Sequence, residues 1–171
     1  MPGTAGTRTW NGAPQMAHRA LTAATTTVLT AALLAATPTA AVAVEHLVFL
    51  GSADVGTGVW DGAGGAPVTL REFTDTGSQH WYWDPDAGTF RNAASAHCLA
   101  ATSGALSQAA CAAEDAQRWE RRPIGDPGST PSLFANAATG ECVTHAGLSA
   151  QLALAPCDAN RADQQWNIYL V

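Results

Sequence analysis

The sequence contains no lysine and few charged residues of either sign. Its eight basic residues are therefore all arginines, and they face fourteen aspartates and glutamates, so the formal net charge is −6. Charged residues make up 13% of the chain, about half of the usual fraction in a globular protein. A chain with so few cations neutralises a nucleic-acid backbone poorly. The composition therefore argues against nucleic acid as a partner.

The chain also lacks an uninterrupted apolar run of about 20 residues, the length that a membrane-spanning helix needs. Its main apolar segment, residues 20–36, contains several threonines and is followed by the small residues Ala41-Val42-Ala43. Sparse basic charge followed by a short apolar run and small residues predicts a secretory signal peptide over residues 1–43, cleaved after Ala43. An uncleaved membrane anchor is the alternative interpretation. Translation from Met16 instead of Met1 would give a leader of more ordinary length.

Cysteine is scarce, and all four copies lie in the predicted mature chain, residues 44–171. This part carries six arginines and fourteen acidic residues, a net charge of −8. We expect it to be secreted and soluble, without membrane contact once the leader is removed. An even number of cysteines in an oxidising compartment indicates disulfides. No CxxC pair of a zinc site is present. Three pairings remain open for Cys98, Cys111, Cys142 and Cys157.

A Gln-x-Trp motif occurs three times in the mature chain. Its copies are Gln79-His80-Trp81, Gln117-Arg118-Trp119 and Gln164-Gln165-Trp166. A large apolar residue or a cysteine stands six or seven positions before each glutamine, at Phe73, Cys111 and Cys157. Apolar residues recur with period two upstream of this position, as at Val68 and Leu70, which is typical of a half-buried strand. A motif repeated in this way predicts three copies of one structural unit.

A second motif recurs in the last two repeats. Residues 92–98 and 136–142 both begin with Asn-Ala-Ala, continue with a serine or threonine and end on a cysteine. Asparagine and hydroxyl residues beside small residues favour tight turns. Each cysteine is therefore expected to begin a strand directly after a turn. No helical period is visible, so each repeat is interpreted as about four short strands.

Three Gln-x-Trp copies, in register with the cysteines and the asparagine turns, resemble the ricin B-type lectins. The resemblance covers residues 46–171 and implies an all-β fold, a β-trefoil with three Gln-x-Trp lobes. It also implies pairing within each lobe, Cys98 with Cys111 and Cys142 with Cys157. In the first lobe, Phe73 and the segment 48–50 would replace the disulfide by packing. The motif glutamines would bind backbone groups within their own lobes, and the motif tryptophans would lie in the core, as we also expect for Trp83.

The same resemblance implies one shallow sugar pocket on each lobe. Lectins of this family use an aspartate two residues after the first cysteine, an aromatic ring two residues before the second, and an asparagine directly before the Gln-x-Trp glutamine. The aspartate position holds Ala100 in the second lobe and Thr144 in the third. The ring position holds Arg71, Ala109 and Ala155 in the three lobes, and the asparagine position holds Ser78, Ala116 and Asp163. The family's galactose site is therefore predicted to be altered or lost.

Two groups of residues remain as candidates for carbohydrate binding. In the first lobe they are Asp54, Trp60 and Asp61, where a tryptophan and two carboxylates in a glycine-rich stretch would form an unusual sugar platform. In the third lobe they are Thr144, His145, Asp163 and Gln164, near the position of the family's pocket. The alternatives are that Trp60 packs beneath its own loop and that polar residues near a turn have no binding role.

No catalytic motif is visible. The histidines form neither HExxH nor a recognisable Ser/His/Asp pattern, and no Gly-x-Ser-x-Gly is present. We therefore expect a noncatalytic, lectin-like protein without cofactor or metal, monomeric, that binds a glycan or polysaccharide. The alternative is a trefoil with decayed sugar sites that binds an extracellular protein through its loops, as an inhibitor or a structural component. The long loop over residues 123–131 is where such a partner would bind.

Overall fold

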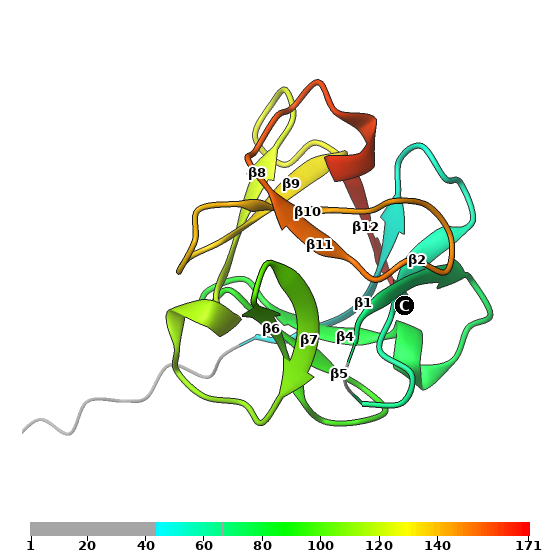
Figure 1. The fold of residues 1–171 in the computed structure, drawn as a ribbon, viewed down its shortest axis with the longest axis vertical. Coiled ribbons are helices and arrows are strands. Elements are labelled where there is room, and N and C mark those ends of the chain that lie inside the picture. The colour runs from blue at the N-terminus through cyan, green and yellow to red at the C-terminus, as the bar shows by residue number, and fades with distance from the viewer. Residues whose placement is uncertain (1–43, 66) are drawn as a thin grey trace, which may run out of the picture. The chain divides into compact units, whose positions relative to one another are not determined.

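The computed structural model describes residues 44–65 and 67–171, so the leader predicted over residues 1–43 lies outside the described residues. Within the described part, twelve strands are divided equally among three lobes (Figure 1). The first lobe contains β1 (His46–Ser52), β2 (Gly58–Asp61), β3 (Thr69–Glu72) and β4 (Trp81–Asp84). The second contains β5 (Thr89–Asn92), β6 (Cys98–Thr102), β7 (Ala105–Ala109) and β8 (Trp119–Pro123). The third contains β9 (Ser132–Asn136), β10 (Cys142–Thr144), β11 (Ala153–Ala155) and β12 (Trp166–Leu170).

The first and last strands pair with each other and close a barrel. β1 is antiparallel to β12, in a register that runs from Val48 opposite Leu170 to Ser52 opposite Trp166, and it also pairs with β4. β4 pairs with β5, and β9 pairs with both β8 and β12. Closure removes open sheet edges from the barrel. The predicted all-β trefoil with four strands per lobe is confirmed.

Gly88 provides the contact between the second lobe's first and last strands. The backbone N–H of Trp119, at the start of β8, donates to the Gly88 carbonyl oxygen over 2.7 Å. Gly88 has a φ of +68°, and a Cβ atom added there would lie 2.8 Å from the Trp119 carbonyl oxygen. Only glycine combines this backbone conformation with so close an approach. The strand spacing at this point of the barrel therefore depends on it.

The remaining strands form three hairpins, β2–β3, β6–β7 and β10–β11, which meet one another (Figure 1). Ala153 of β11 pairs with Ala105 of β7, and Thr69 of β3 forms an isolated bridge with Gln151. The Ser149 N–H donates to the Leu70 carbonyl oxygen over 2.7 Å. The loop before β11 is thus attached to β3, so the third lobe borders the surface of the first.

The Gln-x-Trp motif has the same structural role in all three lobes. Each glutamine ends a short 3-10 helix: η1 (Gly77–Gln79), η2 (Asp115–Gln117) and η3 (Ala162–Gln164). The amide of Gln79 donates to the Glu72 carbonyl and accepts from the Thr74 N–H, both over 2.8 Å. Gln117 and Gln164 make the corresponding pair of bonds around Cys111 and Cys157. Each glutamine therefore fixes the backbone around the position six or seven residues upstream, as the resemblance implied.

The three motif tryptophans are buried, and each indole N–H has an equivalent partner. Nε1 of Trp81 donates to the Trp60 carbonyl oxygen over 3.3 Å. Trp119 and Trp166 donate in the same way to Leu99 and Val143, over 3.2 and 3.1 Å. These acceptors occupy matching places in β2, β6 and β10. The expectation that these tryptophans and Trp83 lie in the core is confirmed.

Two disulfides close the second and third lobes, and an aromatic stack takes their place in the first. Cys98 is bonded to Cys111, and Cys142 to Cys157, which confirms the pairing implied by the resemblance. Phe73 stands where the second cysteine of a lobe would be. Its ring stacks on Phe49 with centroids 4.6 Å apart, and Phe49 stacks on Tyr169 at 4.8 Å. Phe73 is 41% exposed, so this packing forms at the surface and not in the core.

Candidate functional site

The hairpin registers identify the residue of each lobe that occupies the family's aspartate position. Ala100 pairs with Ser107 and Thr144 pairs with Ala153. In the first lobe the same place in the hairpin belongs to Asp61, which pairs with Thr69. Sequence reasoning named Asp61 only as a carboxylate near Trp60. Val59 occupies the position that Cys98 and Cys142 have in the other two lobes. The spacing of two residues from Val59 to Asp61 could therefore have identified Asp61 as the residue at the aspartate position.

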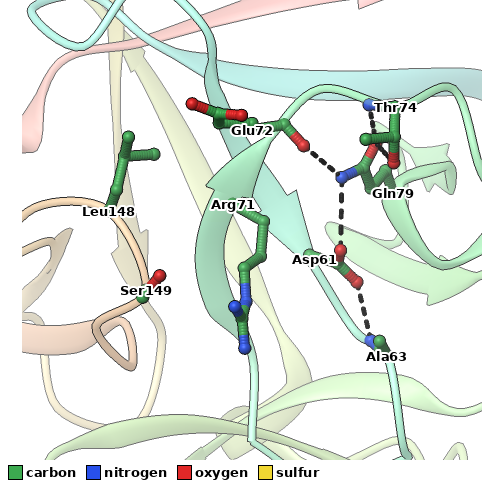
Figure 2. A pocket seen from close by; sticks show the side chains of 8 residues that line it. All are labelled: Asp61, Ala63, Arg71, Glu72, Thr74, Gln79, Leu148 and Ser149. Atoms are coloured by element: carbon green, nitrogen blue, oxygen red, sulfur yellow. Dashed lines mark hydrogen bonds between the residues drawn. The ribbon is translucent and has the colours of Figure 1, made fainter.

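A pocket of about 450 Å³ lies around Asp61 (Figure 2). Its walls come from β2, β3, η1 and the loop that the third lobe extends across β3. Its lining residues are Asp61, Ala63, Arg71, Glu72, Thr74, Gln79, Leu148 and Ser149. The pocket therefore combines two carboxylates, a guanidinium and an amide around the residue that stands at the family's aspartate position.

The Asp61 carboxylate is held in place by its own lobe. Oδ1 accepts the Ala63 N–H over 2.8 Å, and Oδ2 accepts from Nε2 of Gln79 over 3.2 Å (Figure 2). Asp61 is 8% exposed. Each carboxylate oxygen has lone pairs for more than one hydrogen bond. Asp61 thus presents oriented acceptors for ligand hydroxyl groups, and Gln79 links this carboxylate to the Gln-x-Trp framework.

The second lobe has no polar group at the corresponding positions. Alanines occupy the aspartate, ring and asparagine positions, at Ala100, Ala109 and Ala116. A methyl group offers neither a hydrogen bond to a hydroxyl nor a flat apolar face for a sugar ring. This lobe therefore retains the fold of the family without the groups of its sugar site.

In the third lobe, polar residues at these positions bind one another. The Thr144 hydroxyl donates to Oδ2 of Asp163 over 2.7 Å. The Arg161 guanidinium donates to both carboxylate oxygens of Asp163, over 3.1 Å to Oδ1 and 2.5 Å to Oδ2. The hydrogen bond from Arg161 lowers the pKa of Asp163, and the bond from Thr144 adds to this against the opposing effect of burial. A sugar would have to replace these internal contacts to bind here.

His145 belongs to a separate cluster that joins the third lobe to the first. Its Nε2 lies 2.9 Å from Oδ1 of Asp54 and 3.1 Å from the Ser52 hydroxyl oxygen. Its Nδ1 accepts the Gly147 N–H over 3.1 Å. A Ser-His-Asp relay needs the serine and the aspartate on opposite nitrogens of the ring. Here both approach the same nitrogen, so the cluster connects two lobes and lacks the geometry of a hydrolase triad.

Stability is expected to fall in acid through Asp163 and Asp54. Burial raises the pKa of Asp54, but the hydrogen bonds from Ser52 and His145 lower it, and the pKa lies below its ordinary value. A carboxyl with a lowered folded-state pKa stabilises the protein above its unfolded pKa of about 4, and this contribution disappears as the pH falls through the folded value. The thermal midpoint should therefore drop from pH 5 to pH 3, and less steeply in Asp163→Asn. An equally steep drop in Asp163→Asn would contradict this role of Asp163. The control is Asp126→Asn, the same change at an exposed residue, which should leave the pH dependence unchanged.

Two of the predicted binding residues are unavailable to a ligand. The prediction that Trp60 forms a sugar platform is wrong, because its side chain is 0% exposed and packs edge-on against Phe90, Phe134 and Trp166. The alternative, that Trp60 packs beneath its loop, describes its place more closely. Gln164 is also fully buried and binds backbone groups like the other motif glutamines. The structure therefore separates Asp61 from Trp60, and it places Asp54 with His145 instead of in the pocket.

Among residues 44–65 and 67–171, no group of three or more histidine, cysteine, aspartate or glutamate side chains could hold a metal ion. Within the same described residues, no helix has the length and apolar character needed to cross a membrane.

Solved structures with this fold include designed and natural proteins. The designed threefold-symmetric protein ThreeFoil is 17% identical, with a TM-score of 0.63 over 73% of this chain and 99% of that one. The hemolytic lectin CEL-III is 20% identical, with a TM-score of 0.60 over 71% of this chain and 29% of that one. A Polyporus squamosus lectin bound to a human-type influenza-binding epitope is 18% identical, with a TM-score of 0.61 over 74% and 49% of the two chains. At these identities the likeness establishes the fold alone.

A family model gives stronger evidence than the individual structures. No curated protein sequence shows significant similarity to the chain. The model of the ricin-type beta-trefoil lectin domain, however, matches residues 53–166. This range includes all three Gln-x-Trp motifs, both disulfides and the Asp61 pocket, and it covers more than half of the chain. The chain therefore belongs to the ricin-type beta-trefoil lectin domain family.

Proposed function

We propose that this protein is a secreted, noncatalytic carbohydrate-binding protein that uses the first-lobe pocket. The observation that carries the proposal is the Asp61 carboxylate, held by Gln79 at the family's aspartate position within a polar pocket. A fixed carboxylate accepts hydrogen bonds from adjacent sugar hydroxyls. In the second lobe, alanines stand at the equivalent positions. In the third lobe, Thr144 and Asp163 at these positions bind each other. We therefore expect one binding site on each molecule.

Secretion follows from the proposed processing of the chain. Cleavage after Ala43 would release residues 44–171 with a net charge of −8. Two disulfides are compatible with an oxidising extracellular compartment. We propose that the released domain is a monomer whose sugar binding is weak, because a single shallow site without an aromatic platform offers little apolar contact.

Replacement of Asp61 by asparagine is expected to weaken saccharide binding at least tenfold. The change keeps the shape of the side chain but removes the charge that strengthens hydrogen bonds to hydroxyl groups. The oxidised mature chain would be screened on a glycan array and then titrated with its best ligand by calorimetry. The matched control is Asp126→Asn, which makes the same chemical change at an exposed loop residue. Equal affinity of Asp61→Asn and the unmodified chain would contradict the proposed site.

The second candidate function is protein binding by a trefoil whose sugar sites have decayed. Two observations favour it: the alanines at all three second-lobe positions, and the Thr144–Asp163–Arg161 contacts that fill the third. A partner would then bind through loops such as residues 123–131. Absence of binding to every saccharide on the array, by a chain that is folded and oxidised, would favour this function over the first.

A further inference from the structure

Arg71 differs from the other arginines of the described chain in having an almost unpartnered guanidinium. Four of them form ion pairs with carboxylates: Arg91, Arg118, Arg122 and Arg161. Arg121 donates to the Ser132 hydroxyl and the Ser129 carbonyl. Among residues 44–65 and 67–171, the only partner of Arg71 is the Thr69 hydroxyl, which Nε approaches at 3.4 Å. Both terminal nitrogens of Arg71 therefore have no partner in the described part of the chain and can bind a ligand.

The backbone places this free guanidinium at the wall of the pocket. Arg71 lies in β3 opposite Val59 of β2, at the position where the family carries its aromatic ring. Figure 2 shows its side chain extending in a different direction from the Glu72 carboxylate, so these neighbours do not neutralise each other. Leu148, which is 43% exposed, and Ser149 also line this pocket. The site thus contains the Arg71 cation, the carboxylates of Asp61 and Glu72, and an exposed apolar side chain.

We infer that the first-lobe pocket binds a carboxylate-bearing saccharide, a uronic acid, with the carboxylate on Arg71 and ring hydroxyls on Asp61. This inference rests on the proposed carbohydrate-binding function and names its substrate class. A planar guanidinium donates two parallel hydrogen bonds to a carboxylate, and the opposite charges strengthen both bonds, which the hydroxyl groups of a neutral sugar do not do. Repulsion from Asp61 sets the orientation, because it directs the ligand's negative charge toward the Arg71 side. Leu148 would contact the C–H groups of the sugar in place of the missing ring.

Pairs of sugars that differ only at C6 test the inference directly. The oxidised mature chain would be titrated with D-galacturonate and D-galactose, and with D-glucuronate and D-glucose, at pH 7 and about 0.15 M salt. At this ionic strength charges beyond about 8 Å are largely screened. We expect at least one acid to bind at least tenfold more tightly than its neutral counterpart. Galactose 6-sulfate forms a third arm, and tighter binding of the sulfate than of galacturonate would overturn the choice of a carboxylate.

Variants of Arg71 distinguish a shaped site from general charge. Arg71→Gln should abolish the preference for the acid, and Arg71→Lys should retain only part of it, because lysine keeps the charge but lacks the planar fork. Arg118→Gln changes the net charge equally at an exposed ion pair and should leave the preference unchanged. Because Arg71 is exposed, its variants should fold, which circular dichroism would verify.

The possible failures of the two proposals are distinguishable. Equal binding of acidic and neutral sugars, lost in Asp61→Asn, would overturn the uronic-acid inference and leave the proposed function standing. A preference for the acid that survives Arg71→Gln, or that disappears equally in Arg118→Gln, would also overturn the inference. If the folded chain binds no neutral or acidic saccharide, both proposals fail together.

Discussion

Replacement of Trp60 by alanine is expected to lower the free energy of unfolding by about 3–5 kcal/mol, the usual cost of removing a large aromatic side chain from a core. Trp60 is fully buried and lies edge-on to three other aromatic rings, two from β5 and β9 and one from β12. It therefore links the first-lobe hairpin to strands of both other lobes. Urea denaturation of the mature chain, followed by tryptophan fluorescence, would measure the loss.

Phenylalanine substitutions provide a sharper comparison within the same core. Nε1 of Trp60 is buried and has no hydrogen-bond partner among the described residues, whereas Nε1 of Trp81 donates to the Trp60 carbonyl. Trp60→Phe removes an unsatisfied polar group, but Trp81→Phe leaves a buried carbonyl without its donor. The first change should therefore cost less than the second by about 1 kcal/mol or more. A larger loss from Trp60→Phe would contradict the structural account of these two tryptophans.

Removal of both disulfides is expected to cost about 6 kcal/mol in total. The bonded cysteines are 13 and 15 residues apart in sequence, and in the chain-entropy model a closed loop of that size contributes about 3 kcal/mol. A domain whose total stability is about 5–15 kcal/mol would lose much of it. The double variants Cys98→Ala/Cys111→Ala and Cys142→Ala/Cys157→Ala, and their combination, would be compared by urea denaturation.

Reducing agent supplies the control for the disulfide prediction. It should shift the midpoint of the unmodified chain but leave the variant without cysteines unchanged. Because the two disulfides lie in different lobes, their separate costs should add to within about 0.5 kcal/mol. An unmodified chain that keeps its midpoint after complete reduction would contradict the prediction and show that packing alone stabilises the second and third lobes.

Motif spacing predicted three equivalent units and, together with the family resemblance, the trefoil fold, because a trefoil repeats the same contacts three times. In each Gln-x-Trp motif the glutamine accepts a hydrogen bond from a backbone N–H upstream of it, and the indole N–H of the tryptophan donates to a backbone carbonyl. These backbone partners recur at matching positions in the three lobes. The Asn-Ala-Ala turns were predicted for a similar reason, since the side-chain oxygen of Asn92 accepts backbone N–H groups within its own turn. These interactions are local or belong to one lobe, so sequence order expresses them directly.

The candidate site was predicted less well because the first lobe has no cysteines to show which of its residues correspond to those of the other lobes. Val59 replaces a cysteine and Phe73 replaces the other, so the equivalence of Asp61 with Ala100 and Thr144 appears only in the hairpin pairing. Trp60 and Asp61 are adjacent in sequence, but successive residues of a strand face opposite sides. One therefore lies in the core and the other at the pocket, a distinction that a glycine-rich stretch does not reveal.

From the sequence alone, the repeated motifs predicted three equivalent lobes, and the family resemblance implied the trefoil fold and the disulfide partners. Only the tertiary structure decided that Asp61 and Arg71 share a pocket, because the third-lobe loop containing Leu148 and Ser149 completes its wall from about 80 residues away. It also decided that His145 of the third lobe lies 2.9 Å from Asp54 of the first lobe, outside the pocket. The physical reason is that strand pairing within a lobe follows repeated local patterns, whereas side-chain partners between lobes depend on how the closed barrel brings distant segments together.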